Sequence, residues 1–194
     1  MENGFTARLR PGDERAEARD PYEAQYGATM EYYLNFKIPK DARLETENQS
    51  MVVAQLKASN DQSPPLALRW KGNGEFTITI RHDGGEVIAY RGPLQQGSWH
   101  GFEINVTTGE GGRVVVERNG QLLVSYQGPV GYRETFTYFK FGPYDFTKTQ
   151  KSDLAIQYGF FSRASTAYPR DSIASAAARS RENEFPACPS AQSN

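Results

Sequence analysis

Apolar and polar side chains alternate along most of the chain, which is the pattern of β-strands with one buried face. Between residues 30 and 38, every second position is apolar. The same alternation recurs over residues 51–57, 76–81, 102–107, 113–118, 121–126, 134–142 and 153–161. Residues 5–10 alternate as well and predict an edge strand. Almost no helical period precedes residue 170, so the pattern predicts an all-β, antiparallel sandwich or barrel.

Turn signals and composition divide the chain into two parts. Asn119-Gly120 stands between two apolar runs, which is the signature of a tight β-hairpin. Residues 171–194 are instead rich in Ala and Ser, and residues 172–181 predict one short helix that Ser172 would cap. We therefore expect one β-domain over residues 1–165, followed by a short helical or irregular tail over residues 166–194.

Composition and charge exclude several classes of protein. The chain has 194 residues and a formal net charge of -1, from 22 Lys and Arg against 23 Asp and Glu. This balance gives no general electrostatic case for binding nucleic acid or an anionic membrane. No apolar run approaches the ~20 residues of a membrane helix. Cys188 is the only cysteine, which excludes an internal disulfide. Aromatic residues make up 12% of the chain and suit both β-structure and sugar-binding surfaces.

Common catalytic motifs of hydrolases are missing from the sequence. The two histidines, His82 and His100, do not stand at metal-ligand spacing, so a zinc hydrolase is not indicated. There is no Gly-x-Ser-x-Gly motif and no phosphate-binding glycine loop. Glu45 and Glu47 are the nearest approach to a glycosidase carboxylate pair and fall in a predicted loop, which argues against paired-carboxylate hydrolysis.

Candidate chemistry is concentrated in residues 138–144, Tyr-Phe-Lys-Phe-Gly-Pro-Tyr. On a strand, both phenylalanines would point into a core, and Tyr138 and Lys140 would point away from it. Tyr144 would join them if the strand continues past the proline. A cation beside a phenol can make the phenol a usable proton donor or acceptor. Taken alone, the segment is equally consistent with a structural tyrosine and a solvated lysine.

Other candidates are weaker when they are taken alone. Gln55 and Lys57 share one face of a predicted strand, as residues i and i+2 must. For an isolated pair of this kind, an ordinary solvated strand face is the favoured interpretation. Arg15 and Glu17 could equally be a surface ion pair of little consequence.

Taken in order, these segments resemble the β-jelly-roll polysaccharide lyases, in particular the group that contains heparin lyase I and glucuronan lyase. The resemblance covers residues 8–161. It rests on the ordered set of residues 8–17 (Arg-Leu-Arg-Pro-Gly-Asp-Glu-Arg-Ala-Glu), 32–41, 53–57 (Val-Ala-Gln-Leu-Lys), 64–68, 99–102, 112–114, 119–120, 128–132 and 138–144. It implies a jelly-roll, concanavalin-like sandwich and β-elimination on a polysaccharide that contains uronic acid, with a glucuronate-rich polymer as one candidate.

The resemblance also implies roles for individual residues. Gln55 would hydrogen-bond the uronate carboxylate, and Tyr144 would act as base, acid or both. A free tyrosine has a pKa of ~10, so Lys140 beside it would favour the phenolate. Arg15 and Arg8 would add positive charge. The other expected substrate-binding residues are Glu17, Tyr138, Arg81 and His82.

The sequence departs from the lyase pattern at Lys57, where these enzymes often carry histidine. A lysine, with an ordinary pKa of ~10.4, is a poor base unless it is desolvated. Three outcomes stay open: a mechanism carried by Tyr144 alone, an altered substrate chemistry, or loss of activity. The competing hypotheses are a non-catalytic module that binds an acidic polysaccharide, and a structural or adhesion domain on the same scaffold.

The lyase hypothesis carries further expectations. The partner is an acidic polysaccharide, with no nucleic acid and no membrane. Catalysis requires no cofactor and no metal site, and a structural calcium ion in a loop is left open. The protein is expected to be a monomer that is secreted or periplasmic, with its leader absent from this chain.

Overall fold

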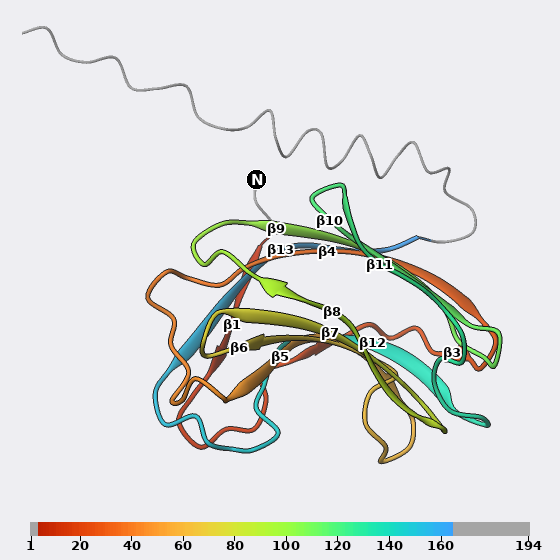
Figure 1. Ribbon diagram of the computed structural model, residues 1–194. Coiled ribbons are helices and arrows are strands. Elements are labelled where there is room, and N and C mark those ends of the chain that lie inside the picture. The colour runs from red at the N-terminus through yellow and green to blue at the C-terminus, as the bar shows by residue number, and fades with distance from the viewer. Residues whose placement is uncertain (1–3, 165–194) are drawn as a thin grey trace, which may run out of the picture. The chain divides into compact units, whose positions relative to one another are not determined.

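The computed structural model describes residues 4–164, which form two antiparallel β-sheets packed face to face (Figure 1). The strands are β1 Phe5–Leu9, β2 Ala18–Arg19, β3 Ala24–Gln25, β4 Thr29–Lys37, β5 Ser50–Ala58, β6 Leu66–Lys71, β7 Glu75–His82, β8 Gly85–Pro93, β9 His100–Thr107, β10 Arg113–Arg118, β11 Gln121–Gln127, β12 Phe136–Tyr144 and β13 Leu154–Arg163. The predicted all-β sandwich is therefore confirmed. The short helix and tail expected beyond residue 165 lie outside the described residues.

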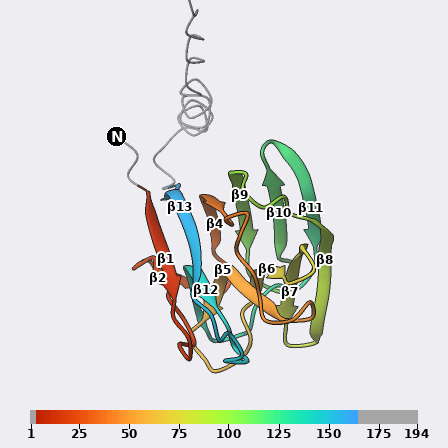
Figure 2. The same ribbon diagram turned by 90° about the vertical axis from the view of Figure 1, so that its left-hand side faces the viewer.

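The strand order places sequence-distant segments side by side. One sheet has six strands in the order β1-β13-β4-β9-β10-β11, and the other has seven, β2-β12-β5-β6-β7-β8 with β3 also paired to β12. In Figure 2, β1 and β13 lie near one edge of the sandwich, and β8 and β11 lie at the opposite edge. The face of the seven-stranded sheet turned away from the core is called the outer face below.

The core between the sheets is built from the alternating apolar positions. Tyr32 of β4 stacks on Phe139 of β12 with ring centroids 4.4 Å apart, which joins the two sheets. The Tyr158 hydroxyl of β13 crosses the core and donates a hydrogen bond to the Val53 carbonyl oxygen of β5 (2.8 Å). Both phenylalanines of the segment 138–144 are buried, as predicted. Burial of these rings therefore turns the intervening side chains of β12 to the outer face.

Strand β12 continues past Pro143, so Tyr144 belongs to it. The pairing of β12 with β5 shifts register between Phe141 and Tyr144, which marks a β-bulge. Gly142 lies in this bulge with φ +132°, and a Cβ there would stand 2.2 Å from the Ala16 carbonyl oxygen. Only glycine lets the backbone of residues 16–17 come this close to β12. The bulge thus brings the segment before β2 against the strand that carries Tyr138, Lys140 and Tyr144.

Within residues 4–164, no helix is long and apolar enough to span a bilayer. The same residues contain no cluster of three or more His, Cys, Asp and Glu side chains that could hold a metal ion.

Candidate active site on the outer face

Cross-strand pairing brings the predicted residues together on the outer face. Lys140 of β12 lies opposite Gln55 of β5, and Tyr138 lies opposite Lys57. Tyr144 lies opposite Val52, which in turn lies opposite Arg69 of β6. Residues that face each other across neighbouring strands are separated by about 5 Å. The strand register therefore gathers two amines, an amide, a guanidinium and two phenols on one face.

Glu17 lies between Gln55 and Lys140. Its Oε1 accepts a hydrogen bond from Gln55 Nε2, and its Oε2 accepts one from Lys140 Nζ at 2.9 Å. The Glu17 side chain is only 1% exposed. A carboxylate this deeply buried needs such partners, because burial of an unpaired charge is strongly unfavourable. The structure thus joins three residues that the sequence placed in the site, and the ammonium group of Lys140 is neutralised by Glu17.

Tyr144 is next to a different cation from the one expected. Arg15 pairs with Tyr144 through a backbone bridge, and its guanidinium lies over the Tyr144 ring, 4.6 Å from the centroid. A hydrogen bond with Glu14 raises the pKa of Arg15, and the negative charge of a Tyr144 phenolate acts in the same direction. Arg15 therefore takes the place beside the phenol that the sequence assigned to Lys140.

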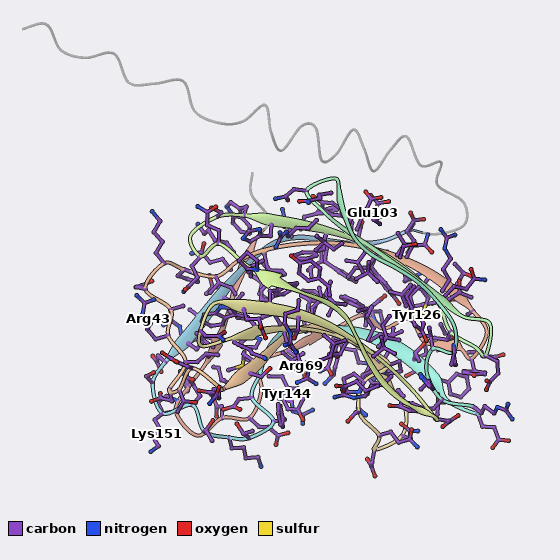
Figure 3. All side chains as sticks on the ribbon, viewed as in Figure 1. Arg43, Arg69, Glu103, Tyr126, Tyr144 and Lys151 are labelled. Atoms are coloured by element: carbon purple, nitrogen blue, oxygen red, sulfur yellow. The ribbon has the colours of Figure 1, made fainter. Side chains whose placement is uncertain are left out.

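Arg69 is a site residue that the sequence reading missed. It projects from the outer side of the seven-stranded sheet beside Tyr144 (Figure 3). Burial lowers its pKa to about 10, the charge of Arg81 adds to the fall, and Glu86 and Tyr144 oppose it. Its guanidinium lies 5.4 Å from the Phe146 ring centroid and forms no ion pair within the described part of the chain. Arg69 is thus a largely buried cation that lacks a carboxylate partner.

Lys57, which stands where the resembling enzymes often have histidine, is held by the loop between β5 and β6. Its Nζ donates to the carbonyl oxygens of Asn60 (2.7 Å) and Gln62 (2.6 Å). Burial lowers the pKa of Lys57, Asp61 opposes the fall, and the nearby charges of Lys140 and Arg15 add to it. Two of the three ammonium hydrogens are therefore occupied by the protein itself.

The remaining predicted residues lie further away. Tyr138 is on the outer face, with the Arg19 guanidinium 3.9 Å from its ring centroid. Arg81 is on β7 of the same sheet and pairs with Glu86. His82 ends β7, where its Nδ1 accepts a hydrogen bond from the Gly84 amide (3.0 Å). Lying at a strand end, His82 is not brought to Tyr144.

Arg8 is not brought to the site. It lies on β1 in the six-stranded sheet, and its nearest carboxylate is Asp153 at 3.9 Å. Both of these side chains are 58% exposed, so the pair belongs to the solvated surface rather than to the outer face. Sequence alternation placed Arg8 on a strand correctly, but it carried no information about which sheet that strand joins.

The antiparallel sandwich thus presents amide, phenol and guanidinium groups together on the outer face of one sheet. The chain belongs to the polysaccharide lyase family, because the model of the family described as "Polysaccharide lyase" matches residues 2–158. The protein is accordingly an enzyme that acts on polysaccharides. No curated protein sequence gives a significant match.

Several solved structures share the fold. An endo-β-1,4-glucuronan lyase from the fungus Trichoderma reesei superposes with a TM-score of 0.69 at 14% identity, over 84% of this chain and 80% of that one. Alginate lyase A1-II′, of polysaccharide lyase family 7, gives 0.61 at 20% identity, over 83% and 78%. Alginate lyase Aly36B gives 0.63 at 11% identity, over 88% and 84%. These likenesses confirm the jelly-roll fold.

Proposed function

We propose that this enzyme cleaves a polysaccharide containing uronic acid by β-elimination, and that it acts outside the cytoplasm. The observation that carries the proposal is Arg69, a largely buried guanidinium without a carboxylate partner, next to Tyr144. A buried cation without a partner is unfavourable for the folded state, so an anionic ligand that completes the pair is the simplest reason for its presence. A uronate carboxylate is such a ligand.

The reaction itself requires a neutralised carboxylate. The proton on C5 of a uronate is weakly acidic while the neighbouring carboxylate carries its charge. Removing that proton pushes negative charge onto the carboxylate, and fixed cations or hydrogen-bond donors must stabilise this charge. Arg69 and Arg15 can supply positive charge there, and the second amide hydrogen of Gln55 can supply a hydrogen bond. Lys140 contributes less, because Glu17 already neutralises it.

Proton transfer falls to Tyr144 in this proposal. The base must remove the C5 proton, and an acid must protonate the glycosidic oxygen that leaves from C4. Tyr144 can do both in turn if the two bonds lie on the same side of the sugar ring. The Arg15 guanidinium lies over the Tyr144 ring and so helps to hold the phenol in place. Lys57 is occupied by two loop carbonyls and so is poorly placed to act as the base.

The names of the similar structures support a uronate substrate. They are a glucuronan lyase and alginate lyases, and both polymers consist of uronic acids. One of them, alginate lyase A1-II′, is described in complex with an alginate oligosaccharide after replacement of one histidine and one tyrosine. Polymers of this kind are too large to enter a cell intact, which is the reason for proposing a secreted or periplasmic enzyme.

The test is to incubate the protein with glucuronate, mannuronate, guluronate, galacturonate and iduronate polymers and to follow the ultraviolet absorbance of the unsaturated product. We expect absorbance to rise with at least one polymer, and Tyr144→Phe to lower kcat by ~10²–10⁴-fold. Tyr126→Phe, on β11 of the other sheet, is the matched control and should retain activity. No product from any polymer would overturn the proposal, and binding without cleavage would favour a non-catalytic role.

A further inference from the structure

We propose that Glu17 is a positioning residue of this site: it fixes the orientation of the Gln55 amide and neutralises Lys140, so that Arg15 and Arg69 receive the substrate carboxylate. The inference rests on the proposed lyase function. It changes the role expected for Glu17, because a side chain that is 1% exposed and bonded through both oxygens is not free to bind a sugar.

The backbone holds Glu17 in a defined place along β12. On one side of it, Arg15 bridges to Tyr144, and on the other side Ala18 pairs with Phe141. At Gly142, a Cβ would stand 2.7 Å from the Glu17 Cα, so the two backbones are in direct contact. Glu17 is therefore fixed between the strand positions of Lys140 and Tyr144 by pairing on both sides.

The contact with Glu17 determines which end of the Gln55 amide faces it. Glu17, paired with the Lys140 ammonium, is a carboxylate and can only accept hydrogen bonds. Gln55 must therefore turn its Nε2 toward Glu17, as the structure shows. Its Oε1 is then left buried without a hydrogen-bond partner within the described residues. A buried acceptor of this kind is suited to a sugar hydroxyl or a protonated carboxyl group, provided that substrate binding opens access to it.

The contact between Glu17 and Lys140 also determines which cations remain available to bind the substrate carboxylate. Lys140 is compensated by Glu17, and Arg15 is partly compensated by Glu14. Arg69 has no carboxylate partner among residues 4–164. If Glu17 were neutral, the Lys140 ammonium would become the nearest uncompensated charge to Gln55. It would then compete with the arginines for the uronate and would draw the sugar toward its own position on β12.

The experiment compares Glu17→Gln with the wild type on the polymer that the wild type cleaves best. We expect kcat to fall by ~10²-fold, the effect of misplacing a reacting group by about 1 Å, while KM changes much less. The double variant Glu17→Gln/Lys140→Met, which also removes the uncovered ammonium group, should leave kcat low, since Gln55 is still not fixed.

Glu110→Gln is the matched control, because Glu110 also pairs with a cation, Arg133, but lies between β9 and β10 of the six-stranded sheet. It should match the wild type in kcat and KM. The inference is overturned if Glu17→Gln keeps the wild-type kcat. It is equally overturned if only KM rises, which would mean that Glu17 binds substrate directly.

A second readout does not depend on activity. In the wild type, the side-chain amide hydrogens of Gln55 should exchange slowly with solvent in an NMR experiment on protein labelled with ¹⁵N-glutamine. Glu17→Ala should speed this exchange at least tenfold, and equal exchange rates would contradict the proposed role. An inactive wild type would refute the lyase proposal alone, and the exchange measurement would still decide whether Glu17 fixes Gln55.

Discussion

Replacing Arg69 with methionine should make the protein more stable and less active at the same time. Methionine keeps an unbranched apolar stem of similar length but removes the charge. In the folded chain that charge is largely buried and has no carboxylate partner within the described residues. The free energy of unfolding should therefore rise when the charge is removed, because the folded state loses an uncompensated cation.

The size of the gain can be worked from the pKa. Burial lowers the pKa of Arg69 from the ordinary value of an arginine to about 10, and one pKa unit corresponds to about 1.4 kcal/mol. Folding with this charge present therefore costs about 3 kcal/mol. The contact with the Phe146 ring, worth about 0.5–2 kcal/mol, is lost in the variant. A net gain of about 1–3 kcal/mol follows, which corresponds to a rise in Tm of about 3–10 °C for a domain of this size.

The direction of the pKa shift of Arg69 also determines how its effect on stability depends on pH. A basic group whose pKa is lower in the folded state destabilises that state fully at every pH below the folded value. The cost fades only as the pH rises from about 10 toward the ordinary pKa of an arginine. The advantage of the variant should therefore be constant across neutral pH.

Urea unfolding at pH 7, followed by tryptophan fluorescence, measures the change, and initial rates on the cleaved polymer measure the loss of activity. We expect kcat/KM to fall by ~10²-fold or more, because a charged hydrogen bond to the carboxylate is lost. Arg91→Met is the control, since Arg91 is exposed and pairs with Glu75 on the same sheet, so its removal should give no gain. A loss of more than about 1 kcal/mol in the Arg69 variant would refute the reasoning, because it would mean that the folded chain stabilises this guanidinium.

Three further predictions concern two supports of the site and one histidine of the other sheet. Gly142→Ala should lower the free energy of unfolding by about 1–3 kcal/mol and reduce activity, because φ at this position is +132° and the added Cβ would overlap the neighbouring backbone. Gly111→Ala is the matched control in urea unfolding, because nothing lies within 4 Å of the Cβ that it adds. His100→Gln should reduce the loss of stability on acidification. Burial lowers the pKa of His100 below 6.5, so the wild type loses stability as the pH falls through 6.5. Equal slopes of the free energy of unfolding against pH in the two proteins, from pH 7.5 to 5, would contradict this. Lys57→Met should speed amide hydrogen exchange in residues 59–64, because the loop loses two hydrogen bonds to an ammonium group. Unchanged exchange in this loop would show that Lys57 does not hold it.

Periodicity was sufficient to predict most of the sandwich. Where a strand pairs without irregularity and buries one face, as β4 and β9 do, alternation locates it within one or two residues. Strand β8 was missed because its pairing with β7 shifts register, Ile88 is exposed, and glycine and proline stand near its end. Strand β6 was missed for another reason: it begins directly after Pro64-Pro65, which reads as a loop.

The site was less accessible to sequence reasoning, because its contacts are long-range. Glu17 meets Gln55 across 38 positions and Lys140 across 123. Nothing in the local pattern specifies such pairings, which depend on strand order and on the bulge at Gly142. Arg69 did carry a local signal, since it alternates with Leu68 and Trp70 on a strand whose other face is buried. Recognising that strand would have placed Arg69 on the outer face.

The partners of each cation, rather than its residue type or its position on the strand, decide what it can do here. Lys57, Lys140 and Arg69 all stand on the outer face of neighbouring strands, yet Lys57 binds two loop carbonyls and Lys140 binds Glu17. Only Arg69 of these three is left without a polar partner among residues 4–164. A charge already matched within the protein adds little to the binding of another anion, whereas an unmatched buried charge gains the full interaction. The lysine at position 57 therefore does not by itself argue against catalysis, because in the proposed mechanism arginine supplies the charge for the uronate and Tyr144 the proton chemistry.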